Sequence, residues 1–343
     1  MKTEKIMFSK ERNVSLTAYL QDVNGEFGFS RRPAMLVIPG GGYTMCSDRE
    51  ADPVAVAYLK AGYQAFVLRY TVKSKGGWPI PLNDYEQAMA VIVENAEAWH
   101  IDPAKIAVVG FSAGGHLAAC AATIAEHKPA AAVLVYPAIL KDIVDICQPG
   151  MPYPHEYVTR ETAPCFFAAA RDDRTVAIQN TLMMEMALAD KGVAFESHIY
   201  SYGGHGFSIA EDWVNTNSVC SRVPRWVSDS IEWLGEVMGK FTRTGFTEPT
   251  ASISMNGDFA PVLSVNCTLR HLCRQSEKVR IVLAPMYTGI KAVAKARGFS
   301  LEGLMAGIGS NTAREIMEMV QIPAETIHEI DRALHGMVNE LEA

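Results

Sequence analysis

The stretch that begins at Lys105 constrains the fold of this chain more than any other. It opens with a β-branched apolar run, Ile106 to Val109, of the length of a buried strand, and from Ala113 to His127 it is small and Ala-rich, which favours a helix. Between the two runs lies Gly110-Phe-Ser-Ala-Gly114. Glycines two positions either side of Ser112 suit a sharp strand-to-helix turn, because side chains there would collide. The stretch therefore predicts a strand, a tight turn and a helix.

This turn would expose the hydroxyl of Ser112 at the N-terminus of the helix. There, the helix dipole and the unpaired N–H groups favour a developing oxyanion. The five-residue pattern also occurs in ordinary turns, so its place between a buried strand and a helix is what favours a nucleophile. We therefore take Ser112 as the candidate nucleophile.

Strands and helices alternate over most of the chain. Apolar runs predict further buried strands at 34–38, 64–70, 131–136, 165–171 and 195–200, with helices expected at 49–62, 84–100, 177–191 and 223–238. Strands that are apolar on both faces predict an α/β fold, a mostly parallel sheet with helices on both faces. Two opening strands, 4–9 and 13–22, are expected to pair antiparallel at one edge.

Residues 139–163 interrupt this alternation. They include a turn-rich, aromatic run, Gln148-Pro-Gly-Met-Pro-Tyr-Pro-His155. Such a run, placed where it could overhang the ends of the strands, predicts a short lid or substrate-contact insertion.

A serine nucleophile needs a base, and the best of the nine histidines is His205. It lies in a glycine-flanked loop, Tyr202-Gly-Gly-His-Gly-Phe207, just past a predicted strand. His116 and His198 lie on a predicted helix and strand, and His328 and His335 on C-terminal helices, so packing or solvent suits them better. We therefore expect His205 to be the general base.

An imidazole base needs an orienting carboxylate, which should follow a strand between the serine and the histidine. Asp172 and Asp173 both stand at that place. We favour Asp173 as the orienting acid and expect Asp172 to cap or brace the loop. The order Ser, Asp, His is that of the α/β-hydrolases.

Three consecutive glycines, Gly40 to Gly42, directly follow the strand at 34–38. They suit either a flexible turn or a backbone that offers free N–H groups at close approach. Beside a serine nucleophile, these N–H groups and that of Ala113 predict an oxyanion hole.

Net charge and the motifs present argue against several kinds of partner and cofactor. The net charge is −7, which argues against nucleic acid or an anionic membrane as partner, and no stretch is long and apolar enough to span a bilayer. Seven scattered cysteines without a Cys-x-x-Cys pair, and an N-terminus unlike a secretory signal, predict a cytoplasmic protein. No metal-ligand or phosphate-loop motif is present, so no metal or cofactor is expected.

The character of the chain changes after residue 240, with Thr247-Glu-Pro-Thr250 as the expected linker. We expect a catalytic domain at 1–240 and a small, mainly helical domain at 241–343, with a strand or hairpin and three to five helices. Thr268 and Ser300 each precede an apolar run as an N-cap would. Ten basic residues against eleven acidic ones argue against a DNA-binding helix-turn-helix, and homo-oligomerisation or cover for the catalytic face is expected instead.

Six separated motifs, taken together, resemble those of α/β-hydrolase esterases of the acetyl-esterase and acetylxylan-esterase-like group. The resemblance covers about residues 14–236. Its motifs are Gly-Gly-Gly-Tyr at 40–43, Ile-Pro-Leu-x-Asp at 80–84, Ile-Asp-Pro at 101–103, Gly-Phe-Ser-Ala-Gly-Gly-His-Leu-Ala-Ala at 110–119, Asp-Asp-x-x-Val at 172–176 and Gly-Gly-His-Gly-Phe at 203–207. One position departs from the pattern: relatives often carry a loop-bracing His before the glycines, where this chain has Pro39.

The resemblance implies an α/β-hydrolase fold and a serine esterase that removes short acyl groups, such as acetyl, from small-molecule or oligosaccharide esters such as acetylated xylan. It implies that Ser112 is the nucleophile, His205 the base and Asp173 the orienting acid. The implied oxyanion donors are Gly41, Gly42 and Ala113. Formamidase and exopeptidase relatives share this triad, so both activities stay open, as does a catalytically silent hydrolase fold that binds partners through 241–343.

Overall fold

The computed structural model describes residues 1–215, 218–250, 257–260 and 262–339. The chain forms two compact units, residues 1–253 and residues 254–343.

The division between the units falls later than the boundary expected at residue 240. A short hairpin, β9 (Phe241–Thr242) and β10 (Gly245–Phe246), belongs with the first unit by its contacts. The ring of Phe241 packs edge to face on Phe29 at 4.7 Å, and the Nζ of Lys105 lies 5.5 Å from the ring centre of Phe246. The two aromatic rings of the hairpin therefore pack on side chains of the first unit.

The first unit is built on one eight-stranded sheet in the order β1-β2-β4-β3-β5-β6-β7-β8. The strands are β1 (Lys2–Ser9), β2 (Val14–Leu20), β3 (Arg32–Ile38), β4 (Gln64–Arg69), β5 (Ile101–Phe111), β6 (Ala132–Val135), β7 (Cys165–Ala170) and β8 (Phe195–Tyr200). The strands from β3 to β8 run parallel, whereas β2 is antiparallel to both β1 and β4. The predicted mostly parallel sheet, with its antiparallel edge, is confirmed.

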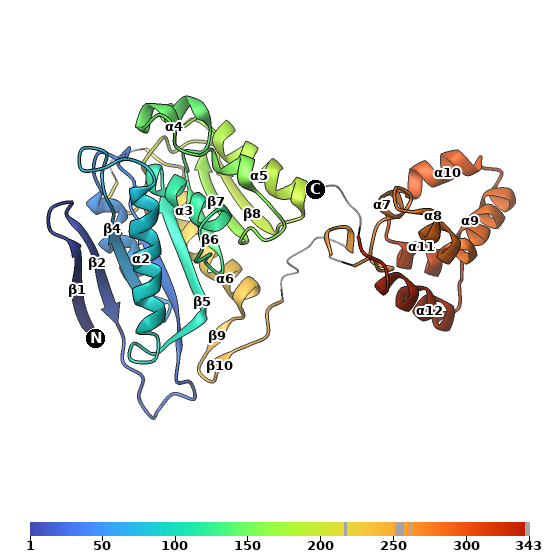
Figure 1. Cartoon of the computed structure of the whole chain (residues 1–343), viewed down its shortest axis with the longest axis horizontal. Helices are drawn as coiled ribbons and strands as arrows, with labels where there is room; N and C mark the ends of the chain where they lie inside the picture. The colour runs from blue at the N-terminus through green and yellow to red at the C-terminus, as the bar shows by residue number, and fades with distance from the viewer. Residues whose placement is uncertain (216–217, 251–256, 261, 340–343) are drawn as a thin grey trace. The chain divides into compact units, whose positions relative to one another are not determined.

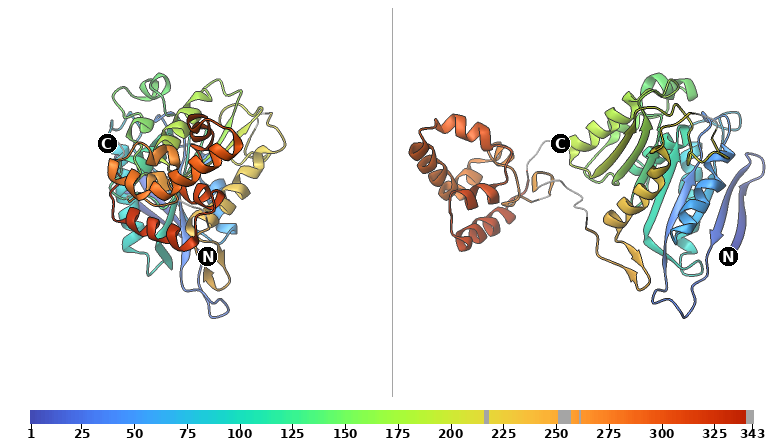
Figure 2. Two further views of the ribbon diagram at one scale, coloured as in Figure 1. Left: turned by 90° about the vertical axis from the view of Figure 1, so that its right-hand side faces the viewer. Right: turned by 180° about the vertical axis from the view of Figure 1, so that it is seen from behind.

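Helices cover both faces of this sheet (Figures 1 and 2). On one face lie α2 (Ile80–Glu94), α3 (Ala113–Thr123) and α5 (Gln179–Lys191), and on the other lie α1 (Asp52–Lys60) and α6 (Trp226–Met238). Short 3-10 turns precede α1 and α6, η1 (Asp48–Glu50) and η3 (Val223–Arg225). Because both faces are covered, strands β3, β6 and β7 are buried along their whole length.

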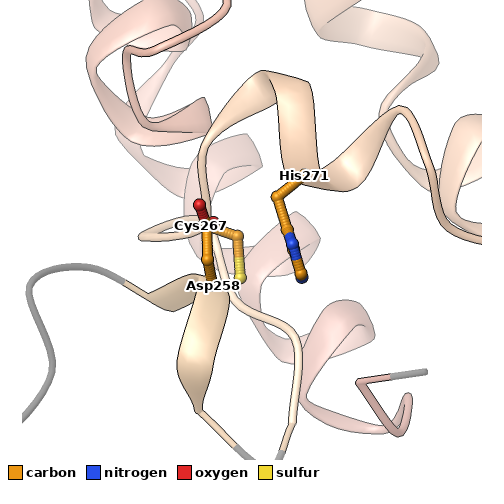
Figure 3. A group of neighbouring side chains, drawn as sticks. All are labelled: Asp258, Cys267 and His271. Carbon is orange, nitrogen blue, oxygen red and sulfur yellow. The ribbon is translucent and has the colours of Figure 1, made fainter. Parts of the chain in front are cut away.

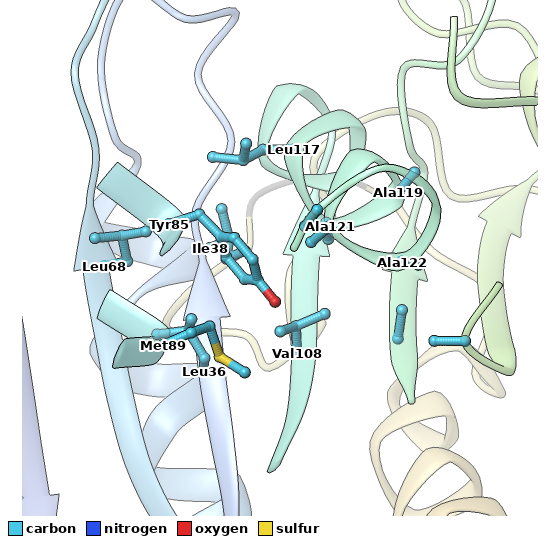
Figure 4. Close-up of a cluster of buried hydrophobic side chains, with 14 of the residues drawn as sticks. Leu36, Ile38, Leu68, Tyr85, Met89, Val108, Leu117, Ala119, Ala121 and Ala122 are labelled. Carbon is cyan, nitrogen blue, oxygen red and sulfur yellow. The ribbon is translucent and has the colours of Figure 1, made fainter. Parts of the chain in front are cut away.

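The core on the α2 and α3 face is shown in Figure 4. Met89 of α2 lies beside Leu36 of β3, Tyr85 of α2 lies beside Ile38 of β3, and Leu117 of α3 belongs to the same cluster. All five side chains are buried. Burial of one such side chain stabilises the fold by roughly 1.5–3 kcal/mol.

The helix expected at 84–100 is found at Ile80–Glu94. It starts earlier because Pro81 lies in its first turn, where a missing N–H leaves no hydrogen bond unmade. The residues that follow Glu94 form turns that lead into β5.

The expected insertion at 139–163 contains α4 (Lys141–Cys147) and a 3-10 turn, η2 (Pro154–Tyr157). It is tied to the serine helix where Nε2 of His116 donates to the carbonyl of Pro152 at 2.8 Å and where the amide of Ala163 donates to the carbonyl of Ala122 at 3.1 Å. Its role as a lid or substrate contact stays a prediction.

The second unit has six α-helices among its described residues, one more than the upper limit expected. They are α7 (Leu269–Leu272), α8 (Glu277–Val282), α9 (Ala284–Arg297), α10 (Leu301–Ile308), α11 (Ala313–Met319) and α12 (Ala324–His335), with a 3-10 turn, η4 (Gly257–Phe259). Pro285 in the first turn of α9 explains the extra helix, because it separates α9 from α8. Thr268 and Ser300 accept backbone hydrogen bonds as N-caps, as predicted.

Candidate active site

Ser112 occupies the turn between β5 and α3, with a backbone conformation that non-glycine residues rarely adopt. Its φ is 52° and its ψ is −116°. A Cβ on Gly110 would overlap the carbonyl of Gly114, and a Cβ on Gly114 would overlap the carbonyl of Ile38. The two glycines therefore allow the close packing of strand, turn and helix that presents the hydroxyl.

His205 lies in the loop that follows β8 and brings its ring between two predicted site residues. Its Nε2 is 2.9 Å from Oγ of Ser112, and its Nδ1 is 2.7 Å from Oδ2 of Asp173. A carboxylate can only accept, so Nδ1–H donates to Asp173, and Nε2 is left to accept the hydroxyl proton of Ser112. The structure thus brings the three residues together in the arrangement that a base and its nucleophile need.

Asp173, and not Asp172, faces the imidazole. The side chain of Asp173 is only 2% exposed, and its second oxygen accepts the amides of Thr175 and Val176 at 2.8 and 2.9 Å. These bonds hold the carboxylate in one orientation toward His205. Asp173 is therefore fixed from both sides.

Asp172 braces the loop that carries the histidine. One of its oxygens accepts the amides of Gly203 and Gly204 at 2.9 and 3.0 Å. The amide of Gly204, as the larger effect, and that of Gly203 lower the pKa of Asp172. This is the loop-bracing position that was expected for this residue.

The glycine loop after β3 offers free backbone donors. Among the described residues, no acceptor pairs with the amides of Gly41, Gly42 or Ala113. Gly40 differs, because its amide donates to Oε2 of Glu50 at 2.9 Å. The three amides predicted for an oxyanion hole are thus available for a ligand.

His116 links the serine helix to two neighbouring segments. Because Nε2–H donates to Pro152, Nδ1 accepts the hydroxyl proton of Tyr43 at 2.8 Å. Burial lowers the pKa of His116 to about 4. The imidazole is therefore neutral near pH 7, in keeping with the packing role expected for it.

Glu50 is the site residue that the sequence did not reveal. It is 4% exposed and bonds the glycine loop through Gly40, as well as the hydroxyl of Tyr136. Its surroundings, Ser47-Asp-Arg-Glu50, read as an ordinary polar turn. Only its nearness to the glycine loop along the chain could have drawn attention to it.

A separate group of potential metal ligands, Asp258, Cys267 and His271, lies in the second unit (Figure 3). Their ligand atoms lie within 4.8 Å of one another. The amide and hydroxyl of Thr268 donate to Asp258 at 2.5 and 2.7 Å, and His271 bonds Asn339 at 2.9 Å. Because these bonds tie the start of α7 to neighbouring segments, structural hydrogen bonding accounts for the group.

No helix among the described residues has the length and apolar character needed to cross a bilayer. All seven cysteines are free.

The BD-FAE family model matches residues 28–139, which include the glycine loop and the Ser112 turn. MGS-M1, an α/β hydrolase from a Medee basin deep-sea metagenome library, is 40% identical, with a TM-score of 0.64 over 69% of this chain and 98% of that one. The acetyl ester-xyloside bifunctional hydrolase from Caldicellulosiruptor lactoaceticus is 30% identical, with a TM-score of 0.59 over 66% and 88% of the two chains.

A curated relative points in the same direction. The acetylxylan esterase of Xylanibacter ruminicola is 32% identical over 198 residues, which make up 51% of this chain and 41% of that protein. The chain spans less than half the length of the curated relatives it matches.

Proposed function

Because this chain belongs to the α/β-hydrolase family, we propose that its first unit is a serine esterase that removes short acyl groups, acetyl above all, from carbohydrate esters. One observation carries the proposal: the hydrogen bonds from Ser112 to His205 and from His205 to Asp173, at 2.9 and 2.7 Å. No structural role requires this chain of three side chains at the ends of the strands.

In the first half of the reaction, Oγ of Ser112 attacks the ester carbonyl while Nε2 of His205 takes its proton. The carbonyl oxygen becomes an oxyanion, which accepts hydrogen bonds from the amides of Gly41, Gly42 and Ala113. Loss of one such donor typically costs about 10²–10³ in rate. When the intermediate collapses, the C–O bond to the alcohol breaks, and the imidazolium returns the proton to the departing alcohol.

The second half releases the acyl group. His205 takes a proton from water, the resulting hydroxide attacks the acyl-serine, and the same three amides hold the second oxyanion. Collapse frees the carboxylic acid and gives the proton back to Ser112. The carboxylate of Asp173 keeps Nδ1–H donating and stabilises the imidazolium in both halves.

The substrate class rests on relatives. The structural relative at 30% identity is named as an acetyl ester-xyloside bifunctional hydrolase, and the curated relative as an acetylxylan esterase. Acetylated xylan or its oligosaccharides are therefore the substrates to test first. A panel that adds an N-formyl compound and a peptide separates esterase action from formamidase or exopeptidase action.

The direct test is hydrolysis of p-nitrophenyl acetate by the wild type and by Ser112→Ala. We expect the variant to lose turnover and to keep the wild-type circular dichroism spectrum. Full activity in the variant would remove Ser112 from the mechanism. A wild type that neither hydrolyses esters nor reacts with a fluorophosphonate would instead favour a silent hydrolase fold.

Homo-oligomerisation through the second unit and a cytoplasmic location belong to the same proposal. Exposed apolar side chains on that unit support self-association: Ile281, Phe299, Met319 and Val338 are between 51% and 73% exposed. Light scattering on the full chain, with Ile281→Lys as the variant, tests the first point.

A further inference from the structure

Glu50 is a buried acid that the proposed mechanism does not use. It lies in η1, and its two carboxylate oxygens bond two different parts of the site. Oε2 accepts the amide of Gly40 at 2.9 Å, and Oε1 accepts the hydroxyl of Tyr136 at 2.7 Å. Gly40 directly precedes the candidate oxyanion donors, and a Cβ placed on it would lie 3.0 Å from Cβ of Ser112. Glu50 therefore holds the glycine loop immediately behind the serine.

The other bond of Glu50 leads to the histidine loop. Tyr136, whose hydroxyl donates to Glu50, accepts the amide of Ser208 at 2.9 Å, and its ring packs on that of His205 at 4.9 Å. The Ser208 hydroxyl in turn donates to the carbonyl of Arg49 at 2.6 Å. Residues 49 and 50 are thus hydrogen-bonded to two loops of the site. Glu50 bonds the glycine loop at Gly40, and Arg49 bonds the histidine loop at Ser208.

The hydrogen bonds around Glu50 suit the ionised carboxylate. Both oxygens accept a hydrogen, and neither faces a hydrogen-bond acceptor among the described residues. Burial raises the pKa of Glu50, whereas the hydrogen bonds from Tyr136 and Gly40 and the electrostatic interactions with His205 and Arg49 act against that rise. Tyr70, whose hydroxyl donates to the carbonyl of Pro39, also interacts electrostatically with Glu50.

We propose that Glu50 is a positioning residue of this site, which holds the oxyanion loop and the His205 loop in register and places a second negative charge behind the imidazole. The inference rests on the proposed esterase function. A carboxylate near His205 favours the imidazolium that forms when Ser112 gives up its proton. Asp173 orients the ring by a direct hydrogen bond. Glu50 acts on the ring indirectly, by fixing the position of the two loops and by its negative charge.

The decisive variant is Glu50→Gln, which keeps the shape of the side chain and removes its charge. The amide oxygen can still accept from Gly40, but the amide nitrogen would face the Tyr136 hydroxyl, whose proton then has no acceptor. A misplacement of about 1 Å in a site can cost about 10²-fold in rate. We expect kcat for p-nitrophenyl acetate to fall about 10- to 100-fold, with KM changed by less than about threefold.

The pH profile separates positioning from a purely structural role. Since Glu50 favours the imidazolium, its neutralisation should move the acid limb of the kcat/KM profile to lower pH by roughly half a unit. The matched control is Asp212→Asn, an exposed residue on the segment after His205, which removes the same charge. We expect this control to keep both kcat and the acid limb. The value of kcat is calculated per active site, and the number of active sites is taken from complete labelling with a fluorophosphonate. Unfolded protein then does not contribute to the value.

A second variant keeps the test valid if Glu50→Gln fails to fold. Tyr136→Phe keeps the carboxylate and its bond to Gly40 but removes the bonds to Glu50 and Ser208. We expect kcat to fall by roughly tenfold without a shift of the acid limb to lower pH.

Folded Glu50→Gln and Tyr136→Phe variants with wild-type kcat and acid limb would overturn the proposal. An Asp212→Asn control that shifts the acid limb as much as Glu50→Gln would also overturn it. A wild type without ester hydrolysis would instead count against the proposed function, so the two failures are distinguishable.

Discussion

The carboxylate of Asp173 lies 2.7 Å from Nδ1 of His205, on the side of the ring opposite Ser112. The preceding residue, Asp172, accepts hydrogen bonds from the backbone of the loop that carries the histidine. The two adjacent acids therefore have separable tasks. Asp173 acts on the imidazole ring, and Asp172 acts on the loop that carries it.

This separation predicts different costs for two isosteric variants. Asp173→Asn removes the acceptor that fixes the imidazole tautomer, so kcat should fall by about 10³–10⁴-fold. Asp172→Asn keeps one oxygen that can accept from Gly203 and Gly204, so we expect a loss below about tenfold. Steady-state kinetics on p-nitrophenyl acetate measure both, and a greater loss in the Asp172 variant would reverse our assignment.

The glycine loop gives a second matched pair, Gly41→Ala and Gly42→Ala. Both residues have positive φ, 129° and 60°. A Cβ on Gly41 would overlap the carbonyl of Met45 and lie 2.8 Å from its Cγ, whereas a Cβ on Gly42 meets no atom within 4 Å. Gly41→Ala should therefore displace the loop and lower kcat by about 10²-fold or more.

Gly42→Ala should cost only about 1 kcal/mol of stability, from the left-handed backbone alone. Its kcat should stay within about fivefold of the wild type if the amide keeps its place. Equal losses of kcat in the two variants would show that steric overlap at Gly41 does not control the loop.

His116 predicts a pH dependence of stability. Its pKa is lowered by burial to about 4 in the folded chain, against an ordinary value of about 6.5. Below pH 6.5 the unfolded chain therefore binds more protons at this group than the folded chain. The free energy of unfolding consequently decreases as the pH is lowered from about 6.5 to about 4. The total loss from this group is about 3 kcal/mol.

The test compares the wild type with His116→Gln, which can still donate to Pro152 and accept from Tyr43. Urea unfolding followed by tryptophan fluorescence reports on the first unit, because all five tryptophans lie within residues 1–253. The wild type should lose more stability than the variant between pH 7 and about pH 4.5. Parallel losses would contradict the assignment of a neutral, buried imidazole.

Much of this arrangement follows from local sequence patterns. The Gly-x-Ser-x-Gly turn and the glycine-flanked His205 are recognisable because backbone geometry restricts the residues that fit them. The parallel sheet follows from apolar runs such as 34–38, whose burial on both faces requires helices on both sides.

Other features depend on contacts between distant segments, which no local pattern encodes. Glu50 resembles a solvated acid in sequence, and only the approach of Gly40 and Tyr136 explains its burial. Which of Asp172 and Asp173 orients His205 depends on which side chain the loop after β7 directs toward the imidazole. The hairpin at 241–246 belongs to the first unit because its aromatic rings pack on residues of that unit such as Phe29.

The central claim is that Ser112 is a nucleophile activated by His205. Treatment with a fluorophosphonate, followed by peptide mass spectrometry, tests it most directly. We predict one phosphonyl group on the peptide that contains Ser112 in the wild type, no labelling of Ser112→Ala, and strongly slowed labelling of His205→Ala. An unlabelled Ser112 in a protein that hydrolyses esters, or equal labelling rates in the wild type and His205→Ala, would contradict the account.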